Sequence, residues 1–223
     1  MLKSYVIRKG HYTQAQRKAY DCLSQKYLIN VSEYLDKNDK LNFEDIFSNK
    51  SGVTVEIGFG SGIATAEIAE QNRDKNYIGI EVHRPGIGRL LQEIEKRNLY
   101  NLRIIEYDAY IIFEKLILQD SLEAIHIFFP DPWPKKRHQK RRLVQKPFTQ
   151  LMAGSLIKGG YIYMVTDWED YALSALSQLT ATGGLINAEN GFAVPQGWRP
   201  ETRFEQKGLE KEHIIRELFF NKI

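Results

Sequence analysis

Three glycines follow a short apolar run and could place the polypeptide backbone against a ligand. The run VTVEI leads into GFGSG, so that Gly58, Gly60 and Gly62 stand at alternate positions. Glycine lets a strand-to-helix turn approach a ligand closely, although such a turn can also be only a tight connection. A dinucleotide site of the pattern G-x-G-x-x-G needs a glycine where Ile63 stands, and no Gly-Lys-Ser/Thr follows to hold a triphosphate. With Glu56 two residues ahead, the spacing favours a nucleoside that carries no pyrophosphate.

Carboxylates follow the next two apolar runs, where they could bind the hydroxyls and amines of a nucleoside. Glu81 ends the run YIGIE, 23 residues after Gly58, which is the approximate distance at which an acid reaches ribose hydroxyls in dinucleotide-binding folds. Asp108 ends LRIIEYD and could accept a hydrogen bond from the exocyclic amine of a purine. Each acid could instead cap the helix that follows it. Acids after three successive runs, together with the glycine turn, favour the nucleoside site.

One loop joins an acid to a dense run of positive charge. In FFPDPWPKKRHQKRRL (128–143), Asp131 stands between two prolines, and six of the residues 135–142 are Lys or Arg. The chain carries a net charge of +3, while all residues outside 135–142 sum to −3. A second basic segment spans residues 3–18. A charge run can be only a solvated face, but two concentrated patches on an acidic body favour a polyanionic partner such as nucleic acid. Trp133 could stack on a base or belong to the core.

Alternating strands and helices must position these groups. Five β-branched and aromatic runs predict buried parallel strands at residues 53–60, 77–82, 102–108, 122–129 and 161–167. Apolar residues at helical spacing lie between them, in the stripes Ile63, Ala66, Ile68 and Ala69, and Ile87, Leu90, Leu91 and Ile94. This order predicts an α/β fold with a doubly wound, mostly parallel sheet, whose ligands bind at the carboxyl ends of the strands. Residues 213–220 predict a last strand, antiparallel to its neighbours.

The chain divides into a predicted N-terminal basic arm and helix, residues 1–50 with the helix at 14–35, and a sheet domain, residues 51–223. No apolar run approaches the roughly 18–20 residues of a membrane helix, and no signal-peptide block opens the chain, so we expect a cytoplasmic protein. The single cysteine, Cys22, cannot form an internal disulfide. The five histidines show no metal-ligand spacing, so we expect no metal.

Together these segments resemble the bacterial tRNA (guanine-N7-)-methyltransferases. The resemblance rests on VEIGFGSG, YIGIEVHRPGIGRLL, FFPDPWPKKRHQKRRL, VTDWEDYA and ETRFEQKG, and covers about residues 50–220. It implies the seven-stranded, Rossmann-like fold of the class I methyltransferases, with S-adenosylmethionine as cofactor, tRNA as partner, a monomer or homodimer, and Asp131 as the catalytic residue. At the cofactor it implies Glu56, Gly58, Gly60, Gly62, Glu81, Asp108, Ala109 and Asp131. At the RNA it implies Lys135, Arg137, His138, Gln139, Lys140, Arg141, Arg142, Asp167, Thr202, Arg203, Phe204 and Glu205.

The implied reaction is methyl transfer to N7 of a guanine in the variable loop of tRNA, at position 46. Guanine N7 carries an available lone pair, so no proton must leave before attack, and catalysis can rest on orientation and electrostatics. We therefore expect Asp131 to stabilise charge on the base or to anchor the guanine N1 and N2 donors, and not to act as a general base. Asp167 could bind the same donor edge or cap a helix predicted at residues 168–180.

Three other functions stay open on the sequence. The chain could be a nicotinamide-dependent oxidoreductase, although Ile63 breaks the dinucleotide fingerprint. It could be an RNA-binding module without catalysis, although the acids that would face a cofactor are all present. It could also methylate another RNA or an exocyclic amine, which only the family resemblance argues against.

Overall fold

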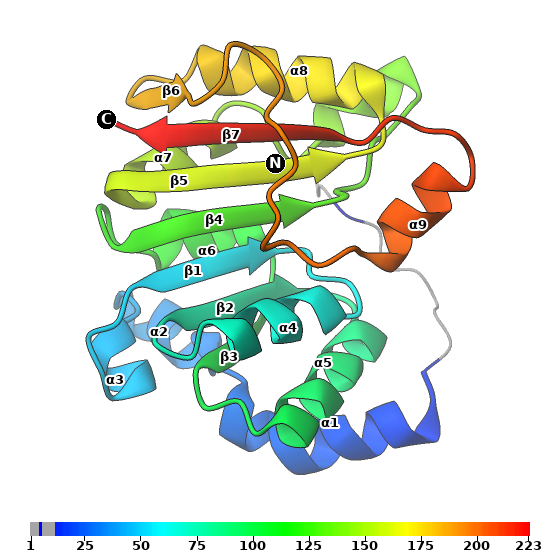
Figure 1. The fold of residues 1–223 in the computed structure, drawn as a ribbon. Coiled ribbons are helices and arrows are strands. Elements are labelled where there is room, and N and C mark those ends of the chain that lie inside the picture. Colours follow the sequence, from blue (N-terminus) through cyan, green and yellow to red (C-terminus); the bar gives the residue numbers. More distant parts are fainter. Residues whose placement is uncertain (1–4, 6–11) are drawn as a thin grey trace.

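The structure, a computed structural model, describes residue 5 and residues 12–223, with the backbone alone of Arg203. A seven-stranded sheet forms its centre (Figure 1). The strands are β1 (Val53–Ile57), β2 (Asn76–Glu81), β3 (Leu102–Glu106), β4 (Leu122–Phe128), β5 (Leu156–Thr166), β6 (Leu185–Asn187) and β7 (Arg216–Lys222). Their order across the sheet is β3-β2-β1-β4-β5-β7-β6. Strand β7 runs antiparallel to β5 and β6, and all other neighbours are parallel, so the predicted mixed sheet is confirmed.

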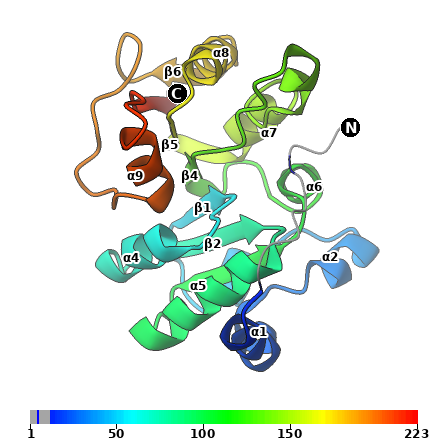
Figure 2. The ribbon, with the colours of Figure 1, turned by 90° about the vertical axis from the view of Figure 1, so that its right-hand side faces the viewer.

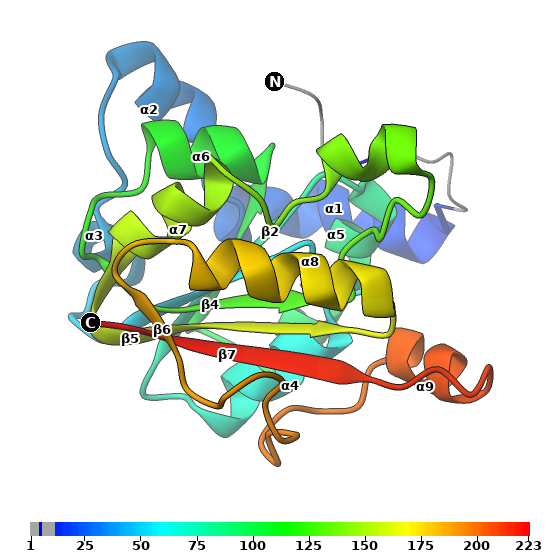
Figure 3. The ribbon, with the colours of Figure 1, turned by 90° about the horizontal axis from the view of Figure 1, so that it is seen from above.

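Helices cover both faces of this sheet (Figures 1 and 3). Helices α4 (Ile63–Gln71) and α5 (Arg84–Arg97) pack into one apolar cluster on one face, and α6 (Ala109–Lys115), α7 (Phe148–Ser155) and α8 (Glu169–Thr180) pack into another on the opposite face. Of the two predicted apolar stripes, the four residues of α5 are fully buried, whereas Ile63 at the start of α4 is exposed. Each layer therefore has its own apolar core against the sheet.

The N-terminal helix predicted at residues 14–35 is wrong as a single element. Two helices occupy the segment, α1 (Gln14–Tyr27) and α2 (Val31–Lys37), and α3 (Phe43–Phe47) follows. Between them Leu28 is extended and pairs in parallel with Ile104, whose carbonyl accepts a hydrogen bond from the Ile29 N–H at 2.9 Å. The break occurs because β3 is an edge strand with unpaired backbone groups, which this short extended segment covers.

Helix α1 packs tightly on α5. A Cβ at Gly88 of α5 would stand 2.6 Å from the carbonyl oxygen of Gln16, so the two backbones touch where glycine stands. The division of the chain at residue 50 stays a prediction, and the basic residues Lys3, Arg8 and Lys9 lie outside the described residues. Among the described residues, no helix is long and apolar enough to cross a membrane.

The carboxyl ends of the parallel strands share one edge of the sheet, which faces the viewer in Figure 2. Helix α9 (Arg203–Leu209) lies beside that edge, although it comes late in the chain. The 3-10 helix η1 (Lys136–Arg141) is formed by the basic segment that follows β4. The predicted site residues are therefore concentrated near one edge.

Candidate active site at the carboxyl edge of the sheet

The backbone angles of the turn after β1 require glycine. Gly58, Gly60 and Gly62 adopt φ angles of +74°, +59° and +68°, a region in which other residues are strained. Apart from its two chain neighbours, no described residue has a heavy atom within 4 Å of the place where a Cβ of Gly58 would stand, which leaves space for a ligand against the backbone. A Cβ at Gly86 of α5 would stand 2.0 Å from the Gly60 carbonyl oxygen, so α5 also approaches the turn through a glycine.

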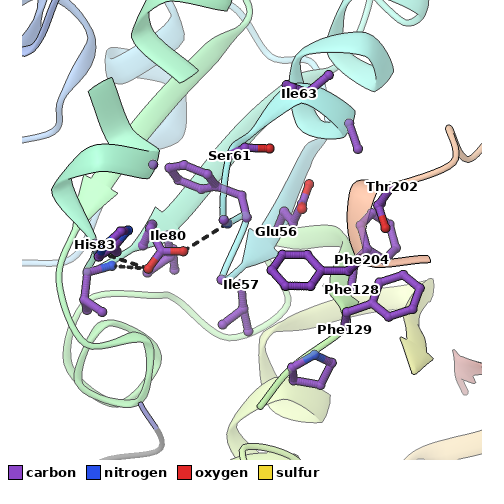
Figure 4. Close-up of a pocket in the computed structure, with 18 of the residues that line it drawn as sticks. Glu56, Ile57, Ser61, Ile63, Ile80, His83, Phe128, Phe129, Thr202 and Phe204 are labelled. Atoms are coloured by element: carbon purple, nitrogen blue, oxygen red, sulfur yellow. Dashed lines mark hydrogen bonds between the residues drawn. The ribbon is translucent and has the colours of Figure 1, made fainter. Parts of the chain in front are cut away.

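Glu81, the last residue of β2, ties this turn to the neighbouring strand. Its Oε2 accepts a hydrogen bond from the Gly60 N–H at 3.0 Å, and its Oε1 accepts from the N–H groups of Val82 and His83 at 2.7 and 3.1 Å (dashed lines in Figure 4). A carboxylate offers about four lone-pair positions. Glu81 thus holds the turn with three of them and can accept a hydrogen bond from a ligand hydroxyl with the fourth.

Glu56 lies at the end of β1 and is 5% exposed. Burial raises the pKa of its carboxyl to about 7; the Thr65 hydroxyl opposes this shift, and the charge of Glu81 adds to it. A cationic group placed beside Glu56 would stabilise its ionised form. The residue is therefore suited to a ligand that brings a positive charge.

A cavity of about 1020 Å³ opens over these groups. Its wall includes the rings of Phe128, Phe129 and Phe204, which lie together beside Glu56 in Figure 4. Small-molecule sites commonly measure about 300–1,000 Å³, so a nucleoside cofactor would leave room beside it. The predicted site residues that line the cavity are Glu56, Gly58, Gly60, Glu81, Ala109, Asp131, Thr202 and Phe204.

Two of the residues predicted at the cofactor have local structural roles beside the cavity. Asp108 is the N-cap of α6, and its Oδ1 accepts a hydrogen bond from the Tyr110 N–H at 2.9 Å, which is the capping alternative. Gly62 precedes α4 and packs against Leu90, whose Cβ would lie 2.6 Å from a Cβ at position 62. Neither lines the cavity, although the residues on either side of each do, so their part in cofactor binding stays a prediction.

Asp131 lies on the loop that leaves β4 and lines the cavity. The loop is held at both ends. The Phe129 N–H donates to the Val165 carbonyl at 2.8 Å, and the Arg142 Nε donates to the Pro132 carbonyl at 3.0 Å. The acid thus reaches the cavity from an anchored segment.

The basic segment after Asp131 contains exposed cations and one buried arginine, Arg142, that anchors the loop. Lys135, Arg137 and Lys140 are exposed, and the Arg141 guanidinium lies over the Trp133 ring, 5.0 Å from its centroid. The Arg142 side chain is only 4% exposed; besides Pro132 it binds the Asp170 carboxylate, and it lies over the Tyr171 ring. Arg142 was predicted to contact the RNA, but it holds the loop to α8 instead. Its buried guanidinium has no open face for a phosphate.

His138 and Gln139 lie between these two groups and are half-buried. The His138 ring meets the edge of Trp133, with 5.9 Å between ring centroids, and Gln139 Nε2 donates to Asp170 at 3.1 Å. Trp133 is half-buried and belongs to the loop surface, with a φ of +45°. The core alternative for Trp133 is therefore wrong, and stacking on a base stays a prediction.

The block around α9 contributes to the cavity and to the packing beneath it. Thr202 and Glu205 form a capping box at the start of α9, and Phe204 is 61% exposed and faces the cavity. Glu205 turns inward and forms an ion pair with Arg199, with 2.7 Å between Oε1 and Nη2. The described part of Arg203 is its backbone at the first residue of α9.

Arg199 joins α9 to strands β5 and β7 through its side chain, and it was not among the residues predicted from the sequence. Its side chain is buried and binds Glu205 together with Glu217 of β7, whose Oε1 lies 3.0 Å from Nη2, and Nε donates to the Tyr163 hydroxyl at 3.2 Å. Burial lowers the pKa of Arg199, but its interactions with Glu205 and Tyr163 outweigh burial and raise it. An acid inside the apolar run HIIRELFF, Glu217, was the signal in the sequence for a buried cation.

Asp167 follows β5 but does not cap α8. Trp168 holds the N-cap position of that helix without a side-chain hydrogen bond. The Asp167 Oδ2 instead lies 3.0 Å from Nδ1 of His213, which precedes β7. The capping alternative is therefore wrong. Within the described ranges, no three His, Cys, Asp or Glu residues cluster in a way that could hold a metal ion.

Comparison with known proteins agrees with this arrangement. The family model described as "Putative methyltransferase" matches residues 50–218. The tRNA (guanine-N(7)-)-methyltransferase of Nitrosomonas eutropha is 46% identical over 99% of this chain and 96% of its own, and that of Francisella tularensis subsp. novicida is 44% identical over 100% and 95%. A crystal structure of the 16S rRNA methyltransferase KamB aligns over 81% of this chain and 93% of its own, with a TM-score of 0.60 and 16% identity, a likeness of fold alone.

Proposed function

The chain belongs to the tRNA (guanine-N7-)-methyltransferase family, and on that premise we propose that it transfers the methyl group of S-adenosylmethionine to N7 of a guanine in tRNA. The target we propose is position 46 in the variable loop. One observation carries the proposal: a single cavity joins the glycine turn and Glu81 to the loop with Asp131, beside a row of exposed cations. A tRNA substrate supports the cytoplasmic location that we propose for the enzyme. Its state as monomer or homodimer stays a prediction.

The floor of the cavity suits the nucleoside half of the cofactor. Glu81 can accept a hydrogen bond from a ribose hydroxyl with the lone pair that its backbone contacts leave over. Open space above Gly58 lets a ligand lie against the backbone. When bound, S-adenosylmethionine supplies an activated methyl group on a cationic sulfur. When ionised, the buried carboxyl of Glu56 would be stabilised by a ligand that carries a positive charge.

Asp131 meets the target base in this proposal. Guanine N7 needs no base to deprotonate it, so the enzyme gains most by orienting the guanine and by stabilising the positive charge that it acquires. A carboxylate can accept from the N1 and N2 donors of guanine and offset that charge. The anchored loop keeps Asp131 at the cavity, which limits the motion that would be lost on binding.

The exposed cations of the loop would hold the tRNA backbone. Lys135, Arg137 and Lys140 are free to meet phosphates, and Arg141 can do so from its place on Trp133. Phosphate contacts fix register, whereas contacts to the base select the nucleotide. The two tasks would thus fall to neighbouring parts of one loop, with Arg142 keeping them in fixed relation.

The decisive experiment incubates unmodified tRNA with the enzyme and methyl-labelled S-adenosylmethionine, followed by nucleoside mass spectrometry and cleavage mapping. We expect 7-methylguanosine at position 46. Label in another nucleoside would assign a different RNA-methylating activity, and tRNA binding without label would indicate a non-catalytic module. Calorimetry that compares the binding of NAD with that of S-adenosylmethionine tests the oxidoreductase alternative, which requires binding of NAD.

The Asp131→Ala variant tests the role of the acid. Cofactor affinity should stay within about twofold of wild type, while methyl transfer falls by about a hundredfold or more, because the variant can neither orient the guanine nor stabilise its charge through this carboxylate. Equal loss of cofactor binding and transfer would show that Asp131 is a cofactor ligand or a structural residue. Asp36→Ala, at an exposed position of α2 outside the cavity wall, controls for general effects of removing an aspartate.

A further inference from the structure

Asp167 leaves the sheet at the same edge as Asp131. Strands β4 and β5 are parallel neighbours in which Phe128 is paired with Val165. Asp131 follows this pair by three residues and Asp167 by two, so both acids emerge at the same edge. The end of β5 therefore presents a second carboxylate near the loop that we propose binds the guanine.

His213 restrains this carboxylate. The ring Nδ1 lies 3.0 Å from Asp167 Oδ2, and the two side chains are 35% and 29% exposed. Because a carboxylate can only accept, Nδ1 carries the hydrogen. In the part of the chain that the structure describes, Asp167 Oδ1 makes no hydrogen bond. One oxygen is thus held and the other is available to a ligand.

The end of α9 presses against the same carboxylate. A Cβ at Gly208 would stand 3.2 Å from Asp167 Oδ2, closer than ordinary van der Waals contact, and the Gly208 carbonyl accepts from the His213 N–H at 3.0 Å. The start of α9 lines the cavity through Thr202 and Phe204. The turn after α9 thus positions His213 beside Asp167, while residues at the start of the same helix line the cavity.

We propose that His213 is a positioning residue for the substrate guanine. By donating to Oδ2, it stops the Asp167 carboxylate from rotating and keeps Oδ1 turned toward the donor edge of the base. His213 itself does not touch the guanine and acts only through Asp167. This inference rests on the proposed function, since it assigns Asp167 to the recognition of the same target base.

A double-mutant cycle tests whether His213 acts through Asp167. His213→Leu keeps the bulk and removes the donor, whereas His213→Asn places an amide nitrogen close to where Nδ1 stands. We expect His213→Leu to lower kcat/KM for tRNA by about tenfold to a hundredfold, as for loss of a hydrogen bond to a charged group. His213→Asn should recover most of that loss. In an Asp167→Ala background, His213→Leu should change kcat/KM by less than about twofold.

Two further measurements separate positioning from folding. The affinity for S-adenosylmethionine should stay within about twofold of wild type in every variant, and melting temperatures show whether each variant folds. Gly208→Ala approaches the same carboxylate from the helix side, so it should lower kcat/KM for tRNA even if His213→Leu is too unstable to assay.

Three results would overturn the inference: an unchanged kcat/KM in His213→Leu, no recovery in His213→Asn, or a full His213→Leu effect in the Asp167→Ala background. A wild-type enzyme that forms no 7-methylguanosine would instead refute the proposed function, and the inference would fall with it. Methylation by wild type together with a full effect in the Asp167→Ala background would refute the inference alone.

Discussion

Replacing Glu56 by glutamine should make the folded protein more stable, and increasingly so as the pH rises. The carboxyl ionises near pH 4.5 in an unperturbed state and near pH 7 in the folded chain, where burial disfavours its charge. Between these values the unfolded chain binds fewer protons than the folded one, so the stability of the wild type falls as the pH rises through this window. At 1.36 kcal/mol per pKa unit, the total is about 3 kcal/mol, of which about 2.5 kcal/mol lies between pH 5 and pH 8.

Urea denaturation of wild type and Glu56→Gln at pH 5, 6, 7 and 8 measures this difference. Glutamine matches the shape of the protonated acid, so the two proteins should be most alike at pH 5 and diverge toward pH 8, with the change levelling off above about pH 7. Other titrating groups are common to both proteins and cancel. Glu189→Gln, on an exposed loop, is the matched control and should show no such divergence.

A gap between wild type and Glu56→Gln that does not depend on pH would refute this reasoning, because it would mean that Glu56 titrates alike in the folded and unfolded chains. A gap that narrows as the pH rises would reverse the sign and show that the ionised carboxylate is stabilised in the fold. A changed denaturant slope would indicate a departure from two-state unfolding, and calorimetric unfolding would then replace the extrapolation.

Two pairs of substitutions test how the site is built. Gly86→Ala should destabilise the protein by about 1–3 kcal/mol and weaken S-adenosylmethionine binding, because the new Cβ would overlap the Gly60 carbonyl. Its control is Gly154→Ala, at a helix position with open space, which should be neutral or slightly stabilising. Equal effects of the two substitutions would contradict the argument. Arg142→Ala should cost about 1–3 kcal/mol of stability in thermal unfolding, because its buried hydrogen bonds and ion pair are removed. Arg141→Ala should instead leave stability nearly unchanged and reduce the salt dependence of tRNA binding by about 0.7–0.9 for each phosphate that is no longer neutralised. An Arg141→Ala protein with unchanged salt dependence would remove that residue from the RNA interface.

Much of the architecture could be predicted because its signals are local. Alternating β-branched runs and helical stripes determined the order of strands and helices, and the alternate glycines after β1 determined a turn with positive φ angles, since other residues are strained there. Glu56 and Glu81 could be placed at the site because parallel strands end at one edge of a sheet. These features depend on the backbone and on near neighbours in the chain.

Only the tertiary structure decided which charged residues face a ligand and which hold the fold. Arg142 belongs to the same basic run as Arg141, yet it is buried because Asp170 of α8 lies beside it. Asp167 acquires His213 from 46 residues away, and the predicted N-terminal helix breaks at Leu28 because the edge of β3 needs a partner. Each outcome depends on a group that is distant in sequence and brought close by packing, so no local pattern of residues specifies it.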